Sequence, residues 1–360
     1  MFSTGRQLID HANYGAAREV FDQYLSTASG SDTRRPEAEY YRAFCALKLN
    51  HTDGEKLVSN FIDDNPSNPR AATAYFDIAN FFYEENNYAK AIKYYKKVTF
   101  PALTSDQQSQ AHFNLGYSLF TQKQLSEALE QFNFVKKQSN AYSPAASYYA
   151  GFIAYNNGQY NEALTDLKRA ETSPSYASVV PYLIANVYYG QHKYDELIAY
   201  AAVLKNRKDV GNQKEISMLV ADAYYFKKDY AKAVAAYEEY LSEKPDKAES
   251  ALLYRAGYAN YALNQDAKAI DYLRKAAGNP DSTSYYASYY LGVLYLKKGD
   301  KLYASNAFDY ARKYKGDQKL VEESTFQFAK VSYDLGKPDV AIATFEQFLK
   351  DFAPVATRLR

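Results

Sequence analysis

The sequence contains no tryptophan and a single cysteine, Cys45. One cysteine excludes an intramolecular disulfide and a metal site built from several thiolates, so we expect Cys45 to pack as a small hydrophobic residue. No run of apolar residues is long enough to cross a bilayer as a helix, and we expect no direct membrane insertion. The opening MFSTGRQLID has neither a basic start nor an apolar stretch, so no export signal is visible.

Neither basic nor acidic residues are in excess, because the chain has 43 basic residues and 42 acidic ones. A formal net charge of +1 gives no general attraction to a phosphate backbone, so nucleic acid is not an expected partner. The 47% share of hydrophobic residues is ordinary for a folded protein and excludes a disordered chain. What the composition has in excess is tyrosine, with 39 residues.

Patterns for catalysis are absent as well. The four histidines, His11, His51, His112 and His192, have no Cys, Asp or Glu at the spacing of metal ligands. Neither a glycine-rich phosphate loop nor a nucleophile elbow occurs. We therefore expect that the protein is not an enzyme and that it binds neither a metal ion nor a cofactor.

What the chain does contain is an internal repeat. Each copy has a small residue, aromatic residues shortly after it, a turn, and then an alanine with a bulky residue four positions later, as in IANFFYEENNYAKAIKYYKKV from Ile78 and VADAYYFKKDYAKAVAAYEEY from Val220. Successive copies are 34 to 38 residues apart, which is the period of a solenoid of helical hairpins. The alanine that opens the second half falls at Ala17, Ala91, Ala128, Ala163, Ala233, Ala269, Ala304 and Ala341, and Glu55 and Leu197 take its place in two copies.

The residue types of one copy predict its local structure. Small residues such as Ala79, Gly116 and Gly257 would let the first helix approach the second closely. Left-handed turn residues are expected at Asn86, Gly158, Asn264, Gly299 and Gly336. Prolines between copies, which would end one helix or begin the next, stand at Pro66, Pro69, Pro101, Pro144, Pro174, Pro245, Pro280 and Pro354.

These features resemble the tetratricopeptide repeat family over essentially the whole chain. The resemblance implies an all-α fold, a right-handed superhelical solenoid of antiparallel helix pairs that forms one continuous array over residues 1–360. About ten units would lie approximately at 1–34, 35–69, 70–107, 108–142, 143–176, 177–211, 212–248, 249–283, 284–318 and 319–354. The usual tryptophan of the first helix is missing.

The phrase FIDDNPSNPRAATAYFDIANFFYEENNYAKAI looks like a subgroup of this family in bacterial envelope proteins, including the Tol-Pal coordinator and outer-membrane assembly lipoproteins. That resemblance implies a periplasmic or envelope-associated protein whose signal is not visible in this chain, with a cytoplasmic location as the alternative.

In this family the first helices line a concave groove. Three positions on each first helix fall on one face, because they lie three residues before the small residue, one after it and four after it. The candidate groove residues are Phe76, Asn80, Tyr83, Phe113, Tyr117, Phe120, Tyr148, Phe152, Tyr155, Tyr182, Asn186, Tyr189, Asp222, Tyr225, Tyr254, Tyr258, Tyr261, Tyr289 and Tyr333. Tyr75, Phe82, Tyr88 and Tyr95, by contrast, are assigned to packing within and between hairpins.

Three functions remain open at this stage. The groove could bind a polypeptide segment, since tyrosine offers apolar area and a hydroxyl at little entropic cost. Rings with Asn and Asp between them would also suit a cell-wall glycan. The rings could instead be core, which would leave an architectural role. Some members hold a terminal carboxylate with a pair of Lys and Asn, or of Lys and Arg. Such pairs are absent here, since the equivalent pairs are Phe76 with Asn80, Tyr182 with Asn186, and Phe326 with Lys330.

The ends of the array carry one further expectation. A terminal unit of a solenoid needs a polar cap, and neither end has an evident one. We expect either that the chain is a segment of a longer array or that it associates with a second copy through an uncapped end.

Overall fold

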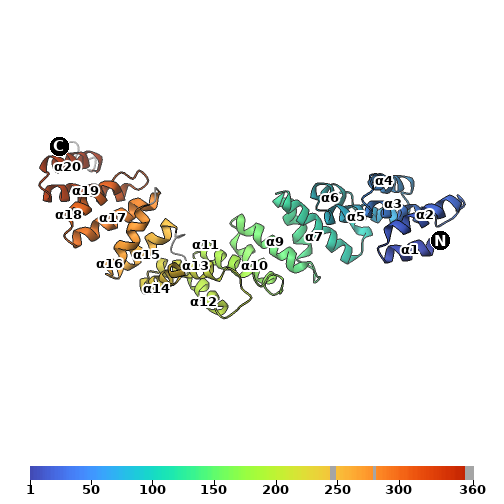
Figure 1. The fold of residues 1–360 in the computed structure, drawn as a ribbon, viewed down its shortest axis with the longest axis horizontal. Helices are drawn as coiled ribbons and strands as arrows, with labels where there is room; N and C mark the ends of the chain where they lie inside the picture. The colour runs from blue at the N-terminus through green and yellow to red at the C-terminus, as the bar shows by residue number, and fades with distance from the viewer. Residues whose placement is uncertain (244–248, 279–280, 353–360) are drawn as a thin grey trace. The chain divides into compact units, whose positions relative to one another are not determined.

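The computed structural model describes residues 1–243, 249–278 and 281–352, and this part of the chain consists of helices and connections without a β-strand. The prolines predicted between copies at Pro245, Pro280 and Pro354 lie outside the described residues. The helices, shown in Figure 1, are α1 (Phe2–Asp10), α2 (Tyr14–Thr27), α3 (Arg35–Lys48), α4 (Gly54–Asp64), α5 (Pro69–Glu84), α6 (Tyr88–Tyr95), η1 (Phe100–Ala102), α7 (Ser105–Thr121), α8 (Leu125–Val135), α9 (Ser143–Asn156), α10 (Tyr160–Glu171), α11 (Val180–Gly190), α12 (Tyr194–Leu204), α13 (Gln213–Phe226), α14 (Tyr230–Glu243), α15 (Ser250–Ala262), α16 (Asp266–Ala277), α17 (Ser282–Lys297), α18 (Lys301–Ala311), α19 (Gln318–Asp334) and α20 (Pro338–Phe352).

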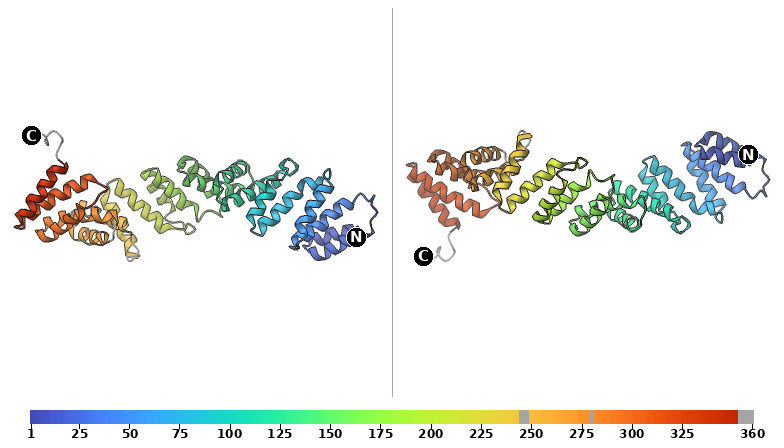
Figure 2. Two further views of the ribbon diagram at one scale, coloured as in Figure 1. Left: turned by 90° about the horizontal axis from the view of Figure 1, so that it is seen from above. Right: turned by 90° about the horizontal axis from the view of Figure 1, so that it is seen from below.

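The helices are arranged as consecutive hairpins. The first helix of a pair packs on the second, as α5 packs on α6 and α15 on α16, and the second packs on the first helix of the next pair, as α6 packs on α7 and α16 on α17. Figure 2 shows the antiparallel course of these pairs from two sides. The predicted all-α fold of paired helices is therefore confirmed.

The chain divides into two compact units, Met1–Ile184 and Ala185–Arg360, and the division falls within α11. A core of buried residues runs through the first unit from Ala17 to Ile153. The second unit has one core between Ala221 and Leu294 and a smaller one around Phe308. In both units, the first helices start within three residues of the unit starts predicted from the sequence.

One residue in each of the ten hairpin turns has a positive φ: Ala12, Asn50, Asn86, Lys123, Gly158, His192, Lys228, Asn264, Gly299 and Gly336. The five Asn and Gly residues predicted for this role are confirmed. The other five were missed, because the turn is held by a backbone hydrogen bond that any residue type can make. The residue after the left-handed one donates its N–H to a carbonyl five residues back, as from Gln159 to Ala154 at 2.9 Å and from Asp229 to Tyr224 at 2.9 Å.

Close approach of the two helices in a hairpin explains the small residues. A Cβ atom added to Gly257 would lie 2.7 Å from Leu273 Cγ, and one added to Gly292 would lie 2.7 Å from Phe308 Cε1. In the second hairpin Glu55 stands where eight other copies have alanine. The close approach is made by its neighbour Gly54, where an added Cβ would lie 2.8 Å from Leu47 Cα. The second hairpin therefore keeps a close contact between its two helices, at the residue before Glu55.

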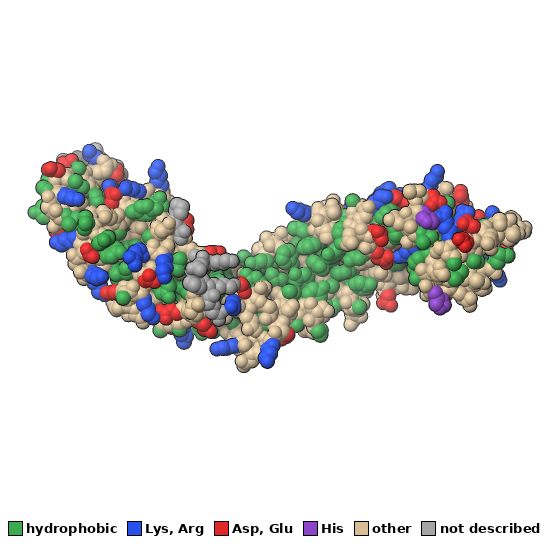
Figure 3. Space-filling view, viewed as in Figure 1, with side chains coloured by type: hydrophobic (Ala, Val, Ile, Leu, Met, Phe, Trp, Pro, Cys, Tyr) green, Lys and Arg blue, Asp and Glu red, His purple; other side chains and the backbone are tan. Residues whose placement is uncertain are grey.

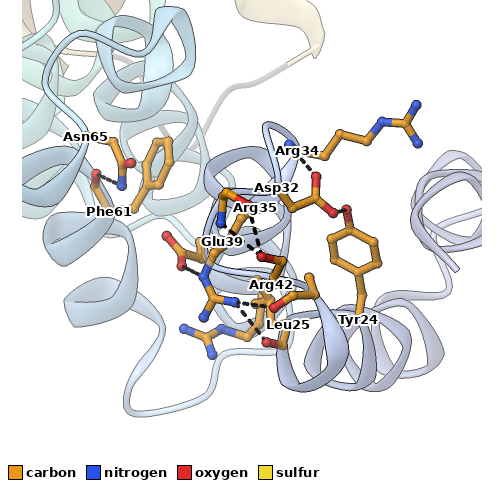
Figure 4. Close-up of polar contacts among 12 residues, drawn as sticks. Tyr24, Leu25, Asp32, Arg34, Arg35, Glu39, Arg42, Phe61 and Asn65 are labelled. Atoms are coloured by element: carbon orange, nitrogen blue, oxygen red, sulfur yellow. Dashed lines mark hydrogen bonds and ion pairs between the residues drawn. The ribbon is translucent and has the colours of Figure 1, made fainter.

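The connection between the first two hairpins shows how linkers are held (Figure 4). Arg35, at the start of α3, donates from Nη1 to the carbonyl oxygens of Leu25 and Ala28 at 3.0 and 3.3 Å, at the end of α2. These are carbonyls that a helix C-terminus leaves without an intrahelical partner. Tyr24, in α2, donates its hydroxyl to Oδ2 of Asp32, in the loop between the two helices, at 2.5 Å. Polar side chains thus fix the orientation of successive hairpins here.

Candidate functional site

The first helices of successive hairpins lie beside one another within each unit. Helix α5 contacts α3 and α7 in the first unit, and α15 contacts α13 and α17 in the second. Side chains on this shared face therefore form one surface across several helices. We call it the first-helix face of each unit.

Most of the predicted groove residues are half-buried on this face. These are Asn80, Tyr83, Phe113, Tyr117, Phe120, Tyr148, Phe152, Tyr155, Tyr182, Asn186, Tyr189, Tyr225, Tyr254, Tyr258, Tyr261 and Tyr289. Tyr333 is 67% exposed. The residues assigned to packing differ among themselves, since Phe82 and Tyr95 are buried whereas Tyr75 and Tyr88 are half-buried. Neither of the two simple interpretations, all core or all open groove, describes these rings.

Phe76 is a correction to the sequence-based interpretation. It is only 4% exposed and belongs to the core of the first unit, so it cannot contact a ligand. Tyr40, at the same position of α3, is equally buried at 3%. The reason is that the flanking first helices cover this position, since α3 and α5 contact each other directly.

Asp222 is a second correction, because it is 3% exposed and its carboxylate is fully engaged inside the second unit. Tyr237 donates its hydroxyl to Oδ1 at 2.5 Å, and Tyr189 donates to Oδ2 at 3.4 Å. Arg255 Nε lies 2.8 Å from Oδ1 as an ion pair whose N–H is not aligned for a hydrogen bond. Burial raises the pKa of Asp222, although Arg255 and the hydroxyls oppose the rise. This carboxylate supports the ring layer from behind.

Asn80 has the same supporting role in the first unit. Its Oδ1 accepts hydrogen bonds from the Tyr95 hydroxyl at 2.6 Å and from Asn114 Nδ2 at 3.1 Å. Because these partners come from α6 and α7, the amide connects one hairpin to the next. The sequence-based prediction that this amide would hold a peptide is therefore not favoured by its geometry.

A tyrosine pair recurs at four turns. The last tyrosine of the first helix meets the first tyrosine of the second helix with ring centroids 5.9 to 6.2 Å apart. The pairs are Tyr83 with Tyr88, Tyr155 with Tyr160, Tyr189 with Tyr194, and Tyr225 with Tyr230. Edge-to-face contacts of this kind stabilise each other while leaving part of each ring uncovered.

In the first unit the rings gather into one group, which we call the first aromatic cluster: Tyr83, Tyr88, Phe113, Tyr117, Phe120 and Tyr149. They come from α5, α6, α7 and α9. Tyr117 stands at the centre, 5.9 Å from Tyr83, 5.7 Å from Tyr88 and 5.4 Å from Tyr149. Figure 3 shows hydrophobic side chains gathered over α7 and α9 on one face of this unit.

The second unit contains a corresponding group, the second aromatic cluster: Tyr225, Tyr230, Tyr254, Tyr258, Tyr261 and Tyr290. They come from α13, α14, α15 and α17. Tyr258 stands at the centre, 5.9 Å from Tyr225, 5.8 Å from Tyr230 and 4.9 Å from Tyr290.

Sequence reasoning missed Tyr149 and Tyr290, although the ring of each contacts four predicted groove residues. Both fall two positions before the small residue, outside the three positions that were counted. A signal was present, since ASYYAG at 146–151 and ASYYLG at 287–292 are nearly the same hexapeptide.

Other predicted residues lie beside the clusters. Tyr148 stacks on Tyr176 at 4.8 Å, Phe152 meets Phe120 at 5.9 Å, and Tyr289 meets Phe308 at 5.9 Å. Tyr182 and Asn186 are half-buried and take part in interactions of their own. These residues extend the ring surface without being central to it.

Burial keeps five tyrosine hydroxyls on this face protonated at neutral pH. Burial raises the pKa of Tyr83 and of Tyr189 to about 12. It raises the pKa of Tyr225, Tyr254 and Tyr290 too. A protonated hydroxyl can donate a hydrogen bond, as that of Tyr189 does to Asp222.

Residues with reactive chemistry have structural surroundings. Cys45 is buried, and burial raises the pKa of its thiol to about 12, which suppresses the thiolate. His112 lies between the rings of Phe100 and Phe134, and burial lowers its pKa. Within the described ranges, no group of three or more His, Cys, Asp or Glu residues is placed to hold a metal ion, and no helix is long and apolar enough to cross a membrane.

Consecutive hairpins with a shared first-helix face define a helical-repeat protein. One model of the tetratricopeptide repeat matches residues 48–106 and 182–248, and a second model of this repeat matches residues 251–282. These matches identify tetratricopeptide repeats in both compact units. Proteins of this family generally mediate interactions between proteins, and their fold is typically a scaffold without catalytic activity.

A solved structure with a TM-score above 0.5 shows the same fold. The C-terminal part of a tetratricopeptide repeat protein from Cytophaga hutchinsonii is similar with a TM-score of 0.53 and 20% identity, over 69% of this chain and 98% of that one. YrrB, described as a TPR protein with an unusual peptide-binding site, has a TM-score of 0.43 and 17% identity, over 53% of this chain and 93% of that one. No curated protein sequence matches the chain.

Proposed function

We propose that this protein is a non-enzymatic scaffold that binds an extended polypeptide segment on the aromatic first-helix face. The observation that supports the proposal is the continuity of half-buried rings across neighbouring first helices, as in the chain of contacts from Tyr83 through Tyr117 to Tyr149. Such a surface tolerates water when empty and offers much apolar area when occupied, without a large loss of side-chain entropy.

The polar groups behind the rings favour a peptide over a glycan. A sugar would need amide or carboxylate groups beside the rings to bind its hydroxyls. Asn80 and Asp222, which the sequence offered for that task, are engaged by Tyr95 and Tyr237 respectively. What the face presents is ring area and tyrosine hydroxyls, which suit the side chains and carbonyl groups of a polypeptide.

The test uses a random peptide library displayed on phage, selected against the immobilised full chain. A selected peptide should lose at least about tenfold in affinity when Tyr155, Tyr189 and Tyr225 are changed to alanine, because aromatic anchors carry much of the binding energy. Tyr303→Ala is the matched control, since Tyr303 is 59% exposed on α18, a second helix.

Circular dichroism of each variant verifies the fold. Unchanged affinity in a folded triple variant would count against the proposal. A glycan array probed with the same proteins separates the alternative, because binding of oligosaccharides that depends on the same tyrosines would replace the peptide as the ligand.

A further inference from the structure

The two aromatic clusters correspond residue by residue. Each member of the second follows its counterpart in the first by 141 or 142 positions, a distance of four repeats. The counterparts are Tyr83 and Tyr225, Tyr88 and Tyr230, Phe113 and Tyr254, Tyr117 and Tyr258, Phe120 and Tyr261, and Tyr149 and Tyr290.

Their contacts agree closely as well. The ring centroids of Tyr83 and Tyr88 are 6.0 Å apart and those of Tyr225 and Tyr230 are 5.9 Å apart. Both pairs have an interplanar angle of 66°. The distance from Phe113 to Tyr149 is 6.3 Å and that from Tyr254 to Tyr290 is also 6.3 Å. The distances from Phe120 to Tyr149 and from Tyr261 to Tyr290 are 5.1 and 5.2 Å.

The layer behind the rings is repeated too. In the first unit Tyr95 donates to Asn80, which also accepts from Asn114. At the corresponding positions Tyr237 donates to Asp222, which pairs with Arg255. A shared residue type at one position would follow from the repeat alone. A whole ring group that recurs four hairpins later together with its own hydrogen-bonded support indicates duplication of a four-hairpin block.

The chemistry of each cluster limits what it can bind. All members are Tyr or Phe, so the cluster contains no charged side chain that could form an ion pair with a charged group of a ligand. The hydroxyls of Tyr83 and Tyr225, whose pKa values burial raises, are protonated donors. A polyproline II segment is complementary to this: it lacks N–H groups where proline stands, its carbonyls have no internal hydrogen bonds, and its preformed shape lowers the entropic cost of docking on aromatic rings.

We infer that the chain carries two equivalent sites, one in each compact unit, and that each binds an uncharged proline-rich segment on its aromatic cluster. This inference rests on the proposed function and specifies its ligand class and its stoichiometry. The second site has two more hydroxyls than the first, because Tyr254 and Tyr261 replace Phe113 and Phe120.

The absence of tryptophan permits a direct test in the full chain. Tyr117→Trp and Tyr258→Trp each create a single fluorescent reporter at the centre of one cluster while keeping an aromatic ring there. The probe is decaproline. Both variants should respond to it, with midpoints within about tenfold of each other. The control Tyr303→Trp, which lies outside the clusters, should not respond.

Calorimetry of the unmodified chain gives the second measurement. We expect two decaproline molecules per chain, and one molecule in either Tyr117→Ala or Tyr258→Ala, where the altered site should weaken by at least about thirtyfold. A peptide of alternating proline and glutamate should bind neither site. If an alanine variant fails to fold, the tryptophan variants still decide the question.

The outcomes separate this inference from the proposed function. A response at only one reporter, or one decaproline per chain, overturns the equivalence of the sites. No response to decaproline at either reporter, together with a response to a library-selected peptide, overturns the ligand class and leaves the scaffold function standing. If no peptide of any kind affects either reporter in folded protein, both proposals fail.

Discussion

At the scale of single residues, the two clusters differ most in the polar group behind the rings. Asn80 with Asn114 is a neutral pair, whereas Asp222 with Arg255 is a charged one in which the Asp222 side chain is 4% exposed. Transfer of two charges from water to this position costs solvation free energy, which the ion pair and the hydroxyl donors only partly return. The charged pair is therefore sensitive to loss of either partner.

We expect Arg255→Met to lower the free energy of unfolding of the unit Ala185–Arg360 by about 3–5 kcal/mol, because it leaves the carboxylate of Asp222 buried without its cation. The double variant Asp222→Asn with Arg255→Asn reproduces the pair of the first cluster. It should remain within about 2 kcal/mol of the unmodified chain. Urea unfolding followed by circular dichroism measures both, and equal losses in the single and double variants would contradict this account.

Asp77 provides a prediction of pH dependence. It accepts a hydrogen bond from Tyr40, and burial raises its pKa despite the opposing effects of Tyr40, Arg70 and Lys48. A carboxyl whose folded pKa exceeds its unfolded pKa binds more protons when folded between those two values. Its contribution to the free energy of unfolding therefore falls as the pH rises through that interval.

We expect Asp77→Asn to remove this contribution, so that the urea midpoint declines less between the normal aspartate pKa and neutrality than in the unmodified chain. Asp63→Asn serves as the control, because Asp63 is exposed on α4. Parallel pH profiles for the Asp77 variant and the unmodified chain would argue against the buried carboxyl as the cause.

At the scale of helices and turns, one residue position in each hairpin controls how closely two helices meet. Gly257→Ala should lower the free energy of unfolding by about 1–3 kcal/mol, because the added Cβ would overlap Leu273. Gly15→Ala in α2 is the matched control, since an added Cβ there meets nothing within 4 Å. This control substitution should raise the free energy of unfolding by up to about 1 kcal/mol. Thermal or urea unfolding measures both, and similar effects of the two substitutions would refute the packing explanation.

The left-handed turn residues allow the opposite kind of change. Lys228 has φ +62°, which costs a residue with a Cβ more than it costs glycine. Lys228→Gly should raise the free energy of unfolding by up to about 1 kcal/mol, whereas Lys298→Gly, at φ −83°, should lower it by about 0.5–1 kcal/mol. Comparison of the two urea midpoints is the check, and a loss at Lys228 would show that its side chain has another role.

These elements also show how far the sequence could predict the structure. Helices, turns and close contacts follow local rules, so Gly158 and Gly257 could be assigned from their neighbours alone. Ring exposure could not, because it depends on the adjacent hairpin, and so Phe76 is buried while Tyr83 is half-buried. Asp222 was misassigned for a similar reason, since its cation Arg255 comes from the next first helix. The cellular compartment stays a prediction.

At the scale of the whole molecule, each compact unit has its own buried core. In a solenoid, the stability of a repeat depends on the repeat itself and on its neighbours. Gly257→Ala should therefore speed amide hydrogen exchange in α13 to α17 and leave α2 to α8 unchanged. Mass spectrometry of exchanged peptides measures this, and a uniform increase along the chain would indicate one cooperative unit instead.

The two versions of the supporting pair also constrain how one block could have diverged from the other. If Asn80 and Asn114 represent the older pair, a change to Arg at the second position first would bury a guanidinium that cannot lose its proton. A change to Asp at the first position is milder, because a buried carboxyl can stay protonated. A viable route between the copies would thus introduce the aspartate before the arginine. The order of the two mutations would follow from the fact that a buried carboxyl can become neutral, whereas a buried guanidinium cannot.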